Sequence, residues 1–451
     1  MAEKKASDLF ASRLGILAAT LGSAVGLGNI WKFPALTGQN GGASFLLIYV
    51  LSTLVVGLPL MIAEMVIGRS TRTNAFRAFT LLTAKPFWWL IGGMGIVAAA
   101  IILAFYSDVA GWVFAYIPKA FSGAISTQDP QEASAVFASL LESPLQSLFW
   151  QWLVLCATAA IIMRGASAGI EKATRILIPL LFLLLIVVCI RSLTLPNAVE
   201  GLRFLFMPDF SRIDSSVILM ALGLSFFKMS IGFGCMITYG SYFRADTNVP
   251  MLATRVMFCD LLVSILAGIA VFPAVFSFGF EPTAGTSLLF LTIPAVFSSM
   301  PGGTLFTALF FILSAVASTG AMLSLMEVPV VWAAETFRVS RRRATLFITA
   351  GIILAGMPAA LGTNVLSHVS LFGLSLFDMY DFLSSNLLLP VGGLLLSLFV
   401  GYVWNRDSAL DVLSNGGALH NRTMARLLLF CCKTITPVLI ALILLHGLHV
   451  L

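Results

Sequence analysis

The chain has 451 residues, of which 59% are hydrophobic and only 10% carry a charge. This composition is typical of an integral membrane protein and excludes a soluble enzyme built around one large core. The net charge of +6 comes largely from arginine and lysine between apolar segments, so it reports on membrane topology and does not predict a nucleic-acid partner. The six cysteines lie in apolar segments and indicate neither disulfides nor a metal site.

The apolar segments predict eleven membrane spans, and the charges between them orient the chain. The spans are expected near residues 11–37, 42–69, 87–118, 146–163, 172–193, 215–243, 252–279, 303–337, 342–362, 377–404 and 424–449. With the N-terminus in the cytoplasm, most arginine and lysine residues between spans fall on the inner side. An odd number of spans then places the C-terminus outside.

The first span is interrupted between Gly22 and Pro34, where three glycines within seven residues precede Asn29. Each glycine weakens a helix by roughly 1 kcal/mol relative to alanine. Backbone groups freed inside a membrane are tolerated only where they line a cavity or bind a ligand. Such a break therefore indicates a transporter site, with the N–H groups of Leu27 and Gly28 facing a substrate carboxylate. Close helix packing through small residues is the alternative interpretation.

The sixth span contains a second interruption, where Ser230, Gly232 and Gly234 follow Lys228 in an apolar run. Two breaks five spans apart predict two five-helix halves of inverted topology with one span appended. The expected fold class is an all-α polytopic membrane protein with a 5+5 inverted repeat, broken helices one and six, and eleven transmembrane helices. Its expected divisions are a cytoplasmic tail (1–10), the first repeat (11–193), an extracellular connection (194–214), the second repeat (215–404), and a cytoplasmic loop with span eleven (405–451).

Four groups of residues resemble motifs of the neurotransmitter:sodium symporter family, and the likeness covers nearly the whole chain. They are Gly22–Pro34, Asn40–Phe45, Gly57–Leu60 with Glu64, Gly68 and Arg69, and Ser230–Gly234 with Thr238, Tyr239, Ser241 and Tyr242. The expected eleven spans are similar to a bacterial amino-acid-transporting branch of that family. The resemblance implies a leucine-transporter-type fold in the cytoplasmic (inner) membrane of a prokaryote. It also implies alternating access around a central site between spans one, three, six and eight.

The resemblance further implies the residues of a substrate site. Tyr106 in span three is similar to the family tyrosine whose hydroxyl holds the substrate carboxylate. The other implied positions are mostly apolar and favour a neutral hydrophobic or aromatic amino acid: Ala24, Gly26, Leu27, Gly28, Ile102, Phe227, Lys228, Ser230, Phe233, Ala321 and Leu325. Packing alone is the alternative role for each aromatic side chain.

The chain departs from the family at the first of two implied sodium sites. That site uses the carbonyl at Ala24, the side chain of Asn29, a span-six hydroxyl and a span-seven asparagine, and Lys228 and Cys259 are expected at the last two positions. An ammonium beside a sodium ion is strongly disfavoured at low dielectric. Lys228 is therefore expected to replace this ion.

The second implied sodium site is also altered. It uses the carbonyls of Gly22, Val25 and Ala317 and two hydroxyls of span eight, where Gly320 and Ala321 are expected here. Ser318 and Thr319 would restore the hydroxyls if the alignment shifted by two residues. Leu224 and Val263 are expected at the chloride positions, so chloride is not expected, no cofactor is implied, and sodium binding should be weakened.

Gates on both sides are implied by the same resemblance. Lys32 and Asp381 match the outer gate, and Glu335 matches the inner acid. The N-terminal Arg-x-x-Trp partner of that acid is not intact, since Ser7 and Phe10 occupy its positions. Lys4 or Lys5 would have to substitute, the alternative being that these are ordinary solvated charges.

Three further residues are expected to support the broken helices. Glu64 is an acid inside the membrane and should accept hydrogen bonds from freed N–H groups. Gly169 and Pro179 resemble a family spacing at which span five unwinds to open an inner water path, and proline weakens a helix interior by about 3 kcal/mol.

The sequence thus predicts a secondary transporter of amino acids or related carboxylates, with sodium dependence reduced or absent. A conventional sodium-coupled symporter is the first alternative. A proton-coupled transporter, an exchanger or a substrate-sensing receptor is the second. An enzyme is not expected, because the four histidines lie outside the broken helices and no nucleophile–base pair is visible. The expected partners are a small-molecule substrate and the lipid bilayer, with the oligomeric state left open.

Overall fold

The computed structural model describes residues 9–125, 130–279, 288–448 and 450, and these are almost entirely helical. The α-helices are α1 (Arg13–Ala24), α2 (Phe33–Gln39), α3 (Ala43–Ser52), α4 (Leu58–Thr71), α5 (Ala75–Leu82), α6 (Trp89–Phe121), α7 (Pro130–Leu141), α8 (Pro144–Ile162), α9 (Lys172–Leu193), α10 (Ala198–Phe206), α11 (Ser215–Lys228), α12 (Cys235–Gly240), α13 (Val249–Ser277), α14 (Ile293–Ser298), α15 (Gly303–Thr336), α16 (Arg341–Leu361), α17 (Leu376–Asp381), α18 (Leu389–Leu398), α19 (Arg406–Leu413), α20 (Arg422–Lys433) and α21 (Ile435–Gly447).

Short stretches of other geometry join or extend these helices. The π-helical turns are η2 (Gly28–Lys32), η3 (Thr53–Gly57), η5 (Ala166–Glu171), η7 (Leu288–Thr292), η8 (Phe382–Leu388) and η9 (Phe399–Val403), and the 3₁₀ turns are η4 (Pro86–Trp88) and η6 (Phe210–Arg212). A small antiparallel hairpin is formed by β1 (Ser370–Leu371) and β2 (Leu374–Ser375).

The expected helical membrane fold is confirmed, but the number of spans is not. Among the described residues, nine helices are long and apolar enough to cross a membrane, and a tenth is added when one bent pair counts as one span. That pair joins Arg13–Ala24 to Gly28–Gln39 at an angle of 53° and is the predicted first span. The predicted sixth span consists of the short helices α11 and α12 on either side of a break, so its length does not identify it.

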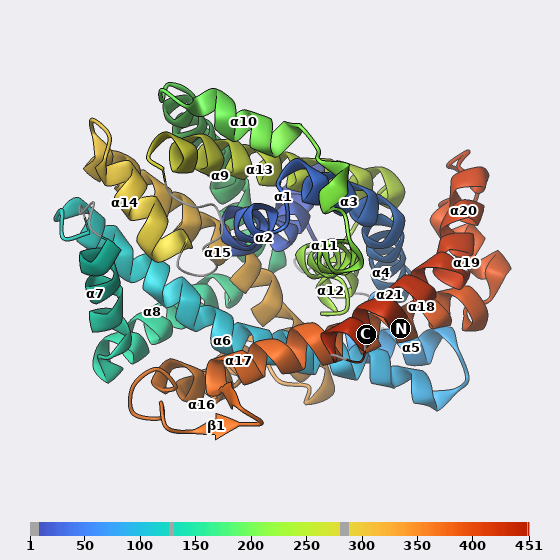
Figure 1. The fold of residues 1–451 in the computed structure, drawn as a ribbon. Helices are drawn as coiled ribbons and strands as arrows, with labels where there is room; N and C mark the ends of the chain where they lie inside the picture. Colours follow the sequence, from blue (N-terminus) through green and yellow to red (C-terminus); the bar gives the residue numbers. More distant parts are fainter. Residues whose placement is uncertain (1–8, 126–129, 280–287, 449, 451) are drawn as a thin grey trace.

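The two broken spans lie in the middle of the bundle. Figure 1 shows α1 and α2 beside α11 and α12 near the centre, with α6, α13 and α15 around them. Helix α15 packs along α6 and α9, and α1 packs against α9, α13 and α15. Any site formed by the breaks is therefore enclosed by helices from both halves of the chain.

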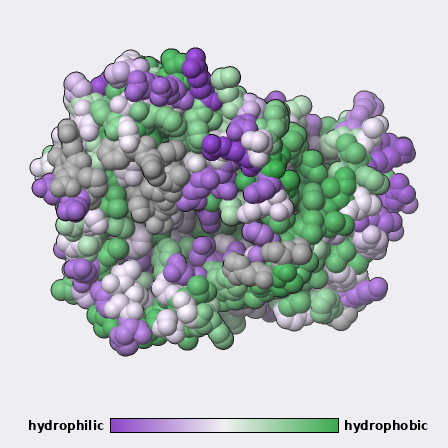
Figure 2. Space-filling view, in the orientation of Figure 1, coloured by the Kyte–Doolittle hydropathy of each residue, from purple (hydrophilic) through white to green (hydrophobic). Residues whose placement is uncertain are grey.

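The outer surface is largely apolar, as a membrane-embedded bundle requires. Large hydrophobic side chains such as Leu145, Phe347 and Leu354 are well exposed. Figure 2 shows broad hydrophobic areas between patches of hydrophilic residues. Because no water-soluble monomer normally exposes so many large apolar side chains, the surface agrees with the composition.

The sixth span is interrupted because three residues between α11 and α12 have positive φ angles. Ser230, Gly232 and Gly234 have φ angles of 54°, 85° and 72°, which lie in the left-handed region that a right-handed helix cannot include. Glycine adopts this region without a steric penalty, and Ser230 is the one residue of the three that has a side chain. The sequence therefore ends α11 after Lys228 and restarts the chain as α12 at Cys235.

Candidate functional site

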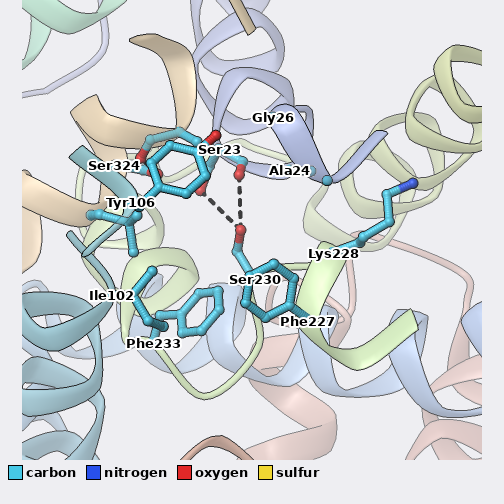
Figure 3. Close-up of a pocket in the computed structure, with 13 residues that line it drawn as sticks. Ser23, Ala24, Gly26, Ile102, Tyr106, Phe227, Lys228, Ser230, Phe233 and Ser324 are labelled. Carbon is cyan, nitrogen blue, oxygen red and sulfur yellow. Dashed lines mark hydrogen bonds between the residues drawn. The ribbon is translucent and has the colours of Figure 1, made fainter. Parts of the chain in front are cut away.

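A small cavity lies between the two breaks and is also bounded by α6 and α15. Its volume is about 40 Å³, which is room for a few water molecules. Its lining residues come from spans one, three, six and eight: Ser23, Ala24, Gly26, Gly28, Ile102, Tyr106, Phe227, Lys228, Ser230, Phe233, Ala321, Ser324 and Leu325 (Figure 3). The structure thus gathers eleven of the twelve predicted substrate-site residues around one pocket, and the twelfth, Leu27, contacts Tyr106.

The polar end of the pocket is formed by the first break and Tyr106. The backbone N–H of Leu27 donates a hydrogen bond of 3.0 Å to the Tyr106 hydroxyl. A Cβ atom at Gly26 would lie 3.2 Å from that hydroxyl and 3.1 Å from Cβ of Ala321, so a larger residue would have to push these neighbours aside. A hydroxyl beside a backbone N–H at a helix break is an arrangement that can bind a carboxylate.

Ser230 connects the two breaks across the pocket. Its hydroxyl donates to the carbonyl of Ser23 at 2.8 Å, and the Ser23 hydroxyl lies 3.5 Å from it (Figure 3). Ser23 and Ser324 were not among the predicted residues. Ser23 lies within the first glycine-rich motif, and Ser324 lies one helical turn after Ala321, so both could have been found from the spacing.

Glu64 supports the second break. One carboxylate oxygen accepts a hydrogen bond of 2.7 Å from the N–H of Gly232. The second oxygen is buried and has no protein partner among the described residues. The predicted contact between an acid inside the membrane and a freed N–H group is therefore present.

Aromatic side chains close the opposite side of the pocket. The rings of Phe227 and Phe233 meet edge to face with their centroids 5.9 Å apart. The ammonium of Lys32 lies 4.5 Å from the centre of the Phe227 ring. This apolar wall can accommodate a hydrophobic side chain.

Lys228 extends away from the pocket into a buried polar cluster. Figure 3 shows its ammonium directed away from Ser230 and Tyr106. The ammonium lies 3.4 Å from Oδ2 of Asp260, donates to the Tyr49 hydroxyl at 2.9 Å, and also donates to the Ser264 hydroxyl. The side chains of Lys228 and Asp260 are 1% and 0% exposed, so this is a fully buried ion pair.

Asn29 joins this cluster to the first break. Its amide nitrogen donates to Oδ1 of Asp260 at 2.7 Å and to the Ser264 hydroxyl at 3.2 Å. Its amide oxygen accepts from the N–H of Gly26 at 3.2 Å. Tyr49 completes the cluster by donating to Oδ2 of Asp260 at 3.2 Å. Asn29 is therefore the link between the pocket and the ion pair.

The expected positions in span seven are wrong by one residue. Asp260 and Ser264, not Cys259 and Val263, face Asn29 and Lys228. Neighbouring residues of a helix point about 100° apart, so Cys259 turns away from the cluster and is partly exposed. The signal that was missed is that Asp260 is the one acid in the apolar run 249–277, and acids inside a membrane are functional by default.

The second ion position shows a different arrangement, in which α15 packs directly on the backbone of α1. A Cβ atom at Gly320 would lie only 2.8 Å from the carbonyl oxygen of Gly22. Ser318 and Thr319 donate their hydroxyls to the carbonyl of Ala315 within their own helix, at 2.9 and 2.8 Å. Gly320 thus faces the Gly22 carbonyl in this structure, and Ala317, Gly320 and Ala321 have no side-chain oxygen.

The predicted outer gate residues do not form an ion pair within the described part of the chain. Lys32 contacts Phe227, whereas Asp381 accepts a hydrogen bond of 2.7 Å from Ser385. On the inner side, Glu335 accepts from the side-chain hydroxyl of Thr73 and from the backbone and side chain of Asn74, at 2.7–3.0 Å. Lys4, Lys5 and Ser7 lie outside the described residues.

Other inner contacts were not predicted. Glu171 of η5 accepts hydrogen bonds from the N–H of Ala11 at 2.6 Å and the Ser12 hydroxyl at 2.7 Å, and so holds the start of α1. Glu327 of α15 pairs with Arg341 and accepts from Tyr242, both at 2.5 Å. These contacts join residues far apart in the chain, and no local spacing marks them.

Gly169 and Pro179 lie in continuous helical structure. Gly169 is within η5 and Pro179 is inside α9, which runs unbroken to Leu193. The predicted unwinding of span five is thus absent from this structure and stays a prediction for another state of the protein.

Discontinuous helices that enclose a central pocket, in an apolar bundle, define a secondary transporter. Residues 7–134 and 143–451 match the sequence profile of the "Sodium:neurotransmitter symporter family". The chain belongs to this family, whose members are transporters and not enzymes.

Proteins from several organisms are similar to this chain in sequence, and a solved structure is similar to it in fold. An uncharacterized sodium-dependent transporter, YhdH of Bacillus subtilis (strain 168), is 40% identical over 416 residues and covers 92% of both chains. The sodium-dependent neutral amino acid transporter B(0)AT2 of Rattus norvegicus is 29% identical over 58% of this chain and 40% of its own. The crystal structure of MhsT in complex with L-phenylalanine superimposes with a TM-score of 0.89 at 39% identity, covering 98% of this chain and 99% of MhsT.

Proposed function

We propose that this protein transports neutral hydrophobic or aromatic amino acids, or related carboxylates, across the cytoplasmic membrane of a prokaryote by alternating access. The observation that carries this proposal is the polarity of the pocket. One end presents the Leu27 N–H group and the Tyr106 hydroxyl, and the other is lined by Phe227 and Phe233. The phenylalanine complex of MhsT and the neutral amino acid activity in the name of B(0)AT2 support the same substrate class.

The size of the pocket fits a closed state of such a transporter. A cavity of about 40 Å³ is smaller than any amino acid side chain with its backbone. Substrate entry therefore requires the pocket to widen, and the Leu27–Tyr106 hydrogen bond to be exchanged for bonds to the substrate carboxylate. Alternating access supplies that widening through movement of the broken helices against their neighbours.

We further propose that Lys228 replaces the first sodium ion. An ammonium carries the same unit charge as sodium and donates three hydrogen bonds, and here it has three partners in Asp260, Tyr49 and Ser264. Since the ammonium points away from the pocket, its influence on the substrate carboxylate is transmitted through Asn29 and the N–H of Gly26. A fixed ammonium supplies affinity but cannot leave with the substrate, so sodium coupling at this position is lost.

We also propose that sodium binding is weakened at the second position, because this chain offers fewer oxygen ligands there than the family does. Sodium prefers hard oxygen ligands, and Gly320 and Ala321 remove two hydroxyls that the family uses there. The carbonyls of Gly22, Val25 and Ala317 would remain as ligands. The protein is accordingly expected to bind substrate with little or no dependence on sodium.

The experiment that tests this function is a binding screen of amino acids on the purified protein, in sodium and in choline. Phenylalanine and other hydrophobic amino acids should bind in both. Tyr106→Phe should weaken binding by roughly 1 to 2 kcal/mol, the loss of a hydrogen bond to a charged group. A parent that binds only in sodium would overturn the role of Lys228, and an unaffected Tyr106→Phe variant would overturn the carboxylate site.

Each alternative function has its own outcome in reconstituted vesicles. A conventional symporter accumulates substrate only with an inward sodium gradient. An exchanger releases internal substrate only when external substrate is supplied. A substrate-sensing receptor binds but shows no uptake under any gradient.

A further inference from the structure

One buried acid of α6 takes no part in the site described above. Asp108 lies two residues after Tyr106 and is 1% exposed. Neither of its carboxyl oxygens has a hydrogen-bond partner among the described residues. An ionised carboxylate without a partner is very costly inside a membrane, whereas the protonated acid is neutral and costs far less.

The groups around Asp108 include both acceptors and one side-chain donor, the indole N–H of Trp112. Ala104, Asp108 and Gly111 share one face of α6, and this face packs against Gln151 of α8 and Gly356 of α16. The Gln151 amide nitrogen donates to the carbonyls of Ala104 and Gly356, both at 3.2 Å, which fixes the orientation of the amide. Its amide oxygen is buried without a donor among the described residues. A protonated Asp108 is the form that can donate a hydrogen bond in such surroundings.

A line of polar side chains leads from Asp108 toward one end of α6. Asp108, Trp112 and Tyr116 recur every four residues and therefore lie along one stripe of the helix. The Trp112 indole nitrogen and the Tyr116 hydroxyl are also buried without a partner among the described residues. Beyond them, the Lys119 ammonium lies 5.9 Å from the centre of the Tyr116 ring. The stripe therefore connects Asp108 to the end of α6 that is expected outside.

Helix α17 covers the part of this stripe at Trp112, whereas Phe137 of α7, Phe290 of η7 and Phe311 of α15 pack on Tyr116. Phe377 of α17 packs on both Phe105 and Trp112, with ring centroids 5.3 and 5.9 Å away. None of the six residues of α17 is buried, and the helix ends at Asp381, the predicted outer gate. A movement of α17 away from α6 would thus hydrate Asp108 at the same time as it opened the outer side.

No charged group from the packed elements compensates Asp108 in the part of the chain that the structure describes. The titratable groups of α8, α15, α16 and α17 are exposed, paired elsewhere or at the helix ends: Cys156, Glu327 and Arg341, Glu335 with Asn74, Arg342 and Arg343, Asp378 with Ser375, Tyr380 with the carbonyl of Ala355, and Asp381 with Ser385. On α6 itself the titratable groups nearest in sequence are Tyr106, Tyr116 and Lys119.

We propose that Asp108 is a proton-binding site of the transport cycle. It holds a proton in the closed structure and releases it to water when α17 moves away and the outer side opens. When substrate binds and the outer side closes, the carboxylate takes one proton from the water of the outer solution that reached it while α17 was displaced. This proposal rests on the transport function proposed above and assigns to it a proton that is bound together with the substrate.

The test compares the parent with Asp108→Asn, which keeps the shape of the neutral acid. Proton uptake is measured by calorimetry of phenylalanine binding in two buffers that differ in ionisation enthalpy. The parent should take up one proton for each phenylalanine bound, and Asp108→Asn should take up none while still binding. Asp407→Asn, at an exposed position of α19, is the control and should match the parent. Equal proton uptake by the parent and Asp108→Asn would overturn the proposal.

A second measurement does not need a substrate or the Asp108 variant. Infrared spectra of the purified protein at neutral pH should show the carbonyl band of a buried protonated carboxyl group. Because Glu64 is another buried acid with an unpartnered oxygen, the band is examined in a Glu64→Gln background, where it should persist. Its disappearance there would overturn the proposal even if Asp108→Asn failed to fold. A parent that binds no amino acid, with the band present, would instead contradict the proposed function and leave the protonated acid in place.

Discussion

The two faces of the first broken span differ in what they contact: one meets charged side chains and the other meets helix backbone. On the face toward α11 and α13, Asn29 meets a buried network that contains Lys228 and Asp260. On the face toward α15, the carbonyl of Gly22 meets Gly320, with no side chain between the two helices. One face thus carries a buried ion pair, and on the other the two helix backbones approach closely. If both faces are former sodium positions, as proposed above, the chain has changed them by two unrelated routes.

The largest effect is expected when the buried ion pair is split. Asp260→Ala leaves the Lys228 ammonium inside the protein without its counter-charge, and breaking a buried pair in this way costs about 3–5 kcal/mol. The variant should show a strongly lowered thermal midpoint in detergent, or fail to accumulate. Lys228→Met in the same background removes the stranded charge and should recover much of the loss. If Asp260→Ala alone unfolds like the parent, the pair does not hold the two helices as the structure implies.

Replacing Lys228 and Asp260 together should make this face of span one resemble the first sodium site of the family. Lys228→Thr with Asp260→Asn removes both charges together and supplies two neutral oxygen ligands, so no unpaired buried charge remains. Substrate binding by the double variant should become sodium-dependent, by about tenfold or more, equivalent to ~1.4 kcal/mol. Cys259→Asn alone is the control, because Cys259 lies outside the cluster and the Lys228–Asp260 pair stays intact. Sodium independence of the double variant would contradict the replacement of the ion by Lys228.

Much of the substrate site could be predicted because its residues are marked locally. Glycines in an apolar run force a break, and Tyr106 and Lys228 are polar groups in segments where such groups must have partners. The partner of Lys228 was misplaced because the spacing of the family was used for span seven, and the local signal, the single acid Asp260 in the run 249–277, was not. A one-residue error there exchanged Cys259 for Asp260. The contacts of Glu171 with the start of α1 depend on tertiary packing between distant segments and leave no pattern in the sequence.

The close contact between Gly320 of α15 and Gly22 of α1 is tested by adding a single methyl group at Gly320. In Gly320→Ala the new Cβ would lie 2.8 Å from the Gly22 carbonyl oxygen, and overpacking of this kind costs about 1–3 kcal/mol. Gly351→Ala is the matched control, since nothing lies within 4 Å of a Cβ there and alanine favours a helix by up to about 1 kcal/mol. The midpoint temperature of thermal unfolding should therefore be lower than that of the parent for Gly320→Ala, and equal or higher for Gly351→Ala. A Gly320→Ser variant that is stable and gains sodium dependence would show that this face retains room for an ion.

The smallest effect is expected where the outer charges meet water, in contrast to the buried pair at Lys228. Lys32 contacts the Phe227 ring and Asp381 contacts Ser385, so closure of the outer side would have to bring the two charges together. Lys32 and Asp381 are both partly exposed, and a pair in contact with water is worth only about 1 kcal/mol. Lys32→Asp or Asp381→Lys alone should slow uptake into vesicles several-fold with little change in thermal stability, and the double exchange should restore part of the rate. Lys32→Asp with Asp378→Lys is the matched control, since Asp378 lies on the same short helix and is held by Ser375. Equal rates in the two double variants would show that Lys32 and Asp381 act separately.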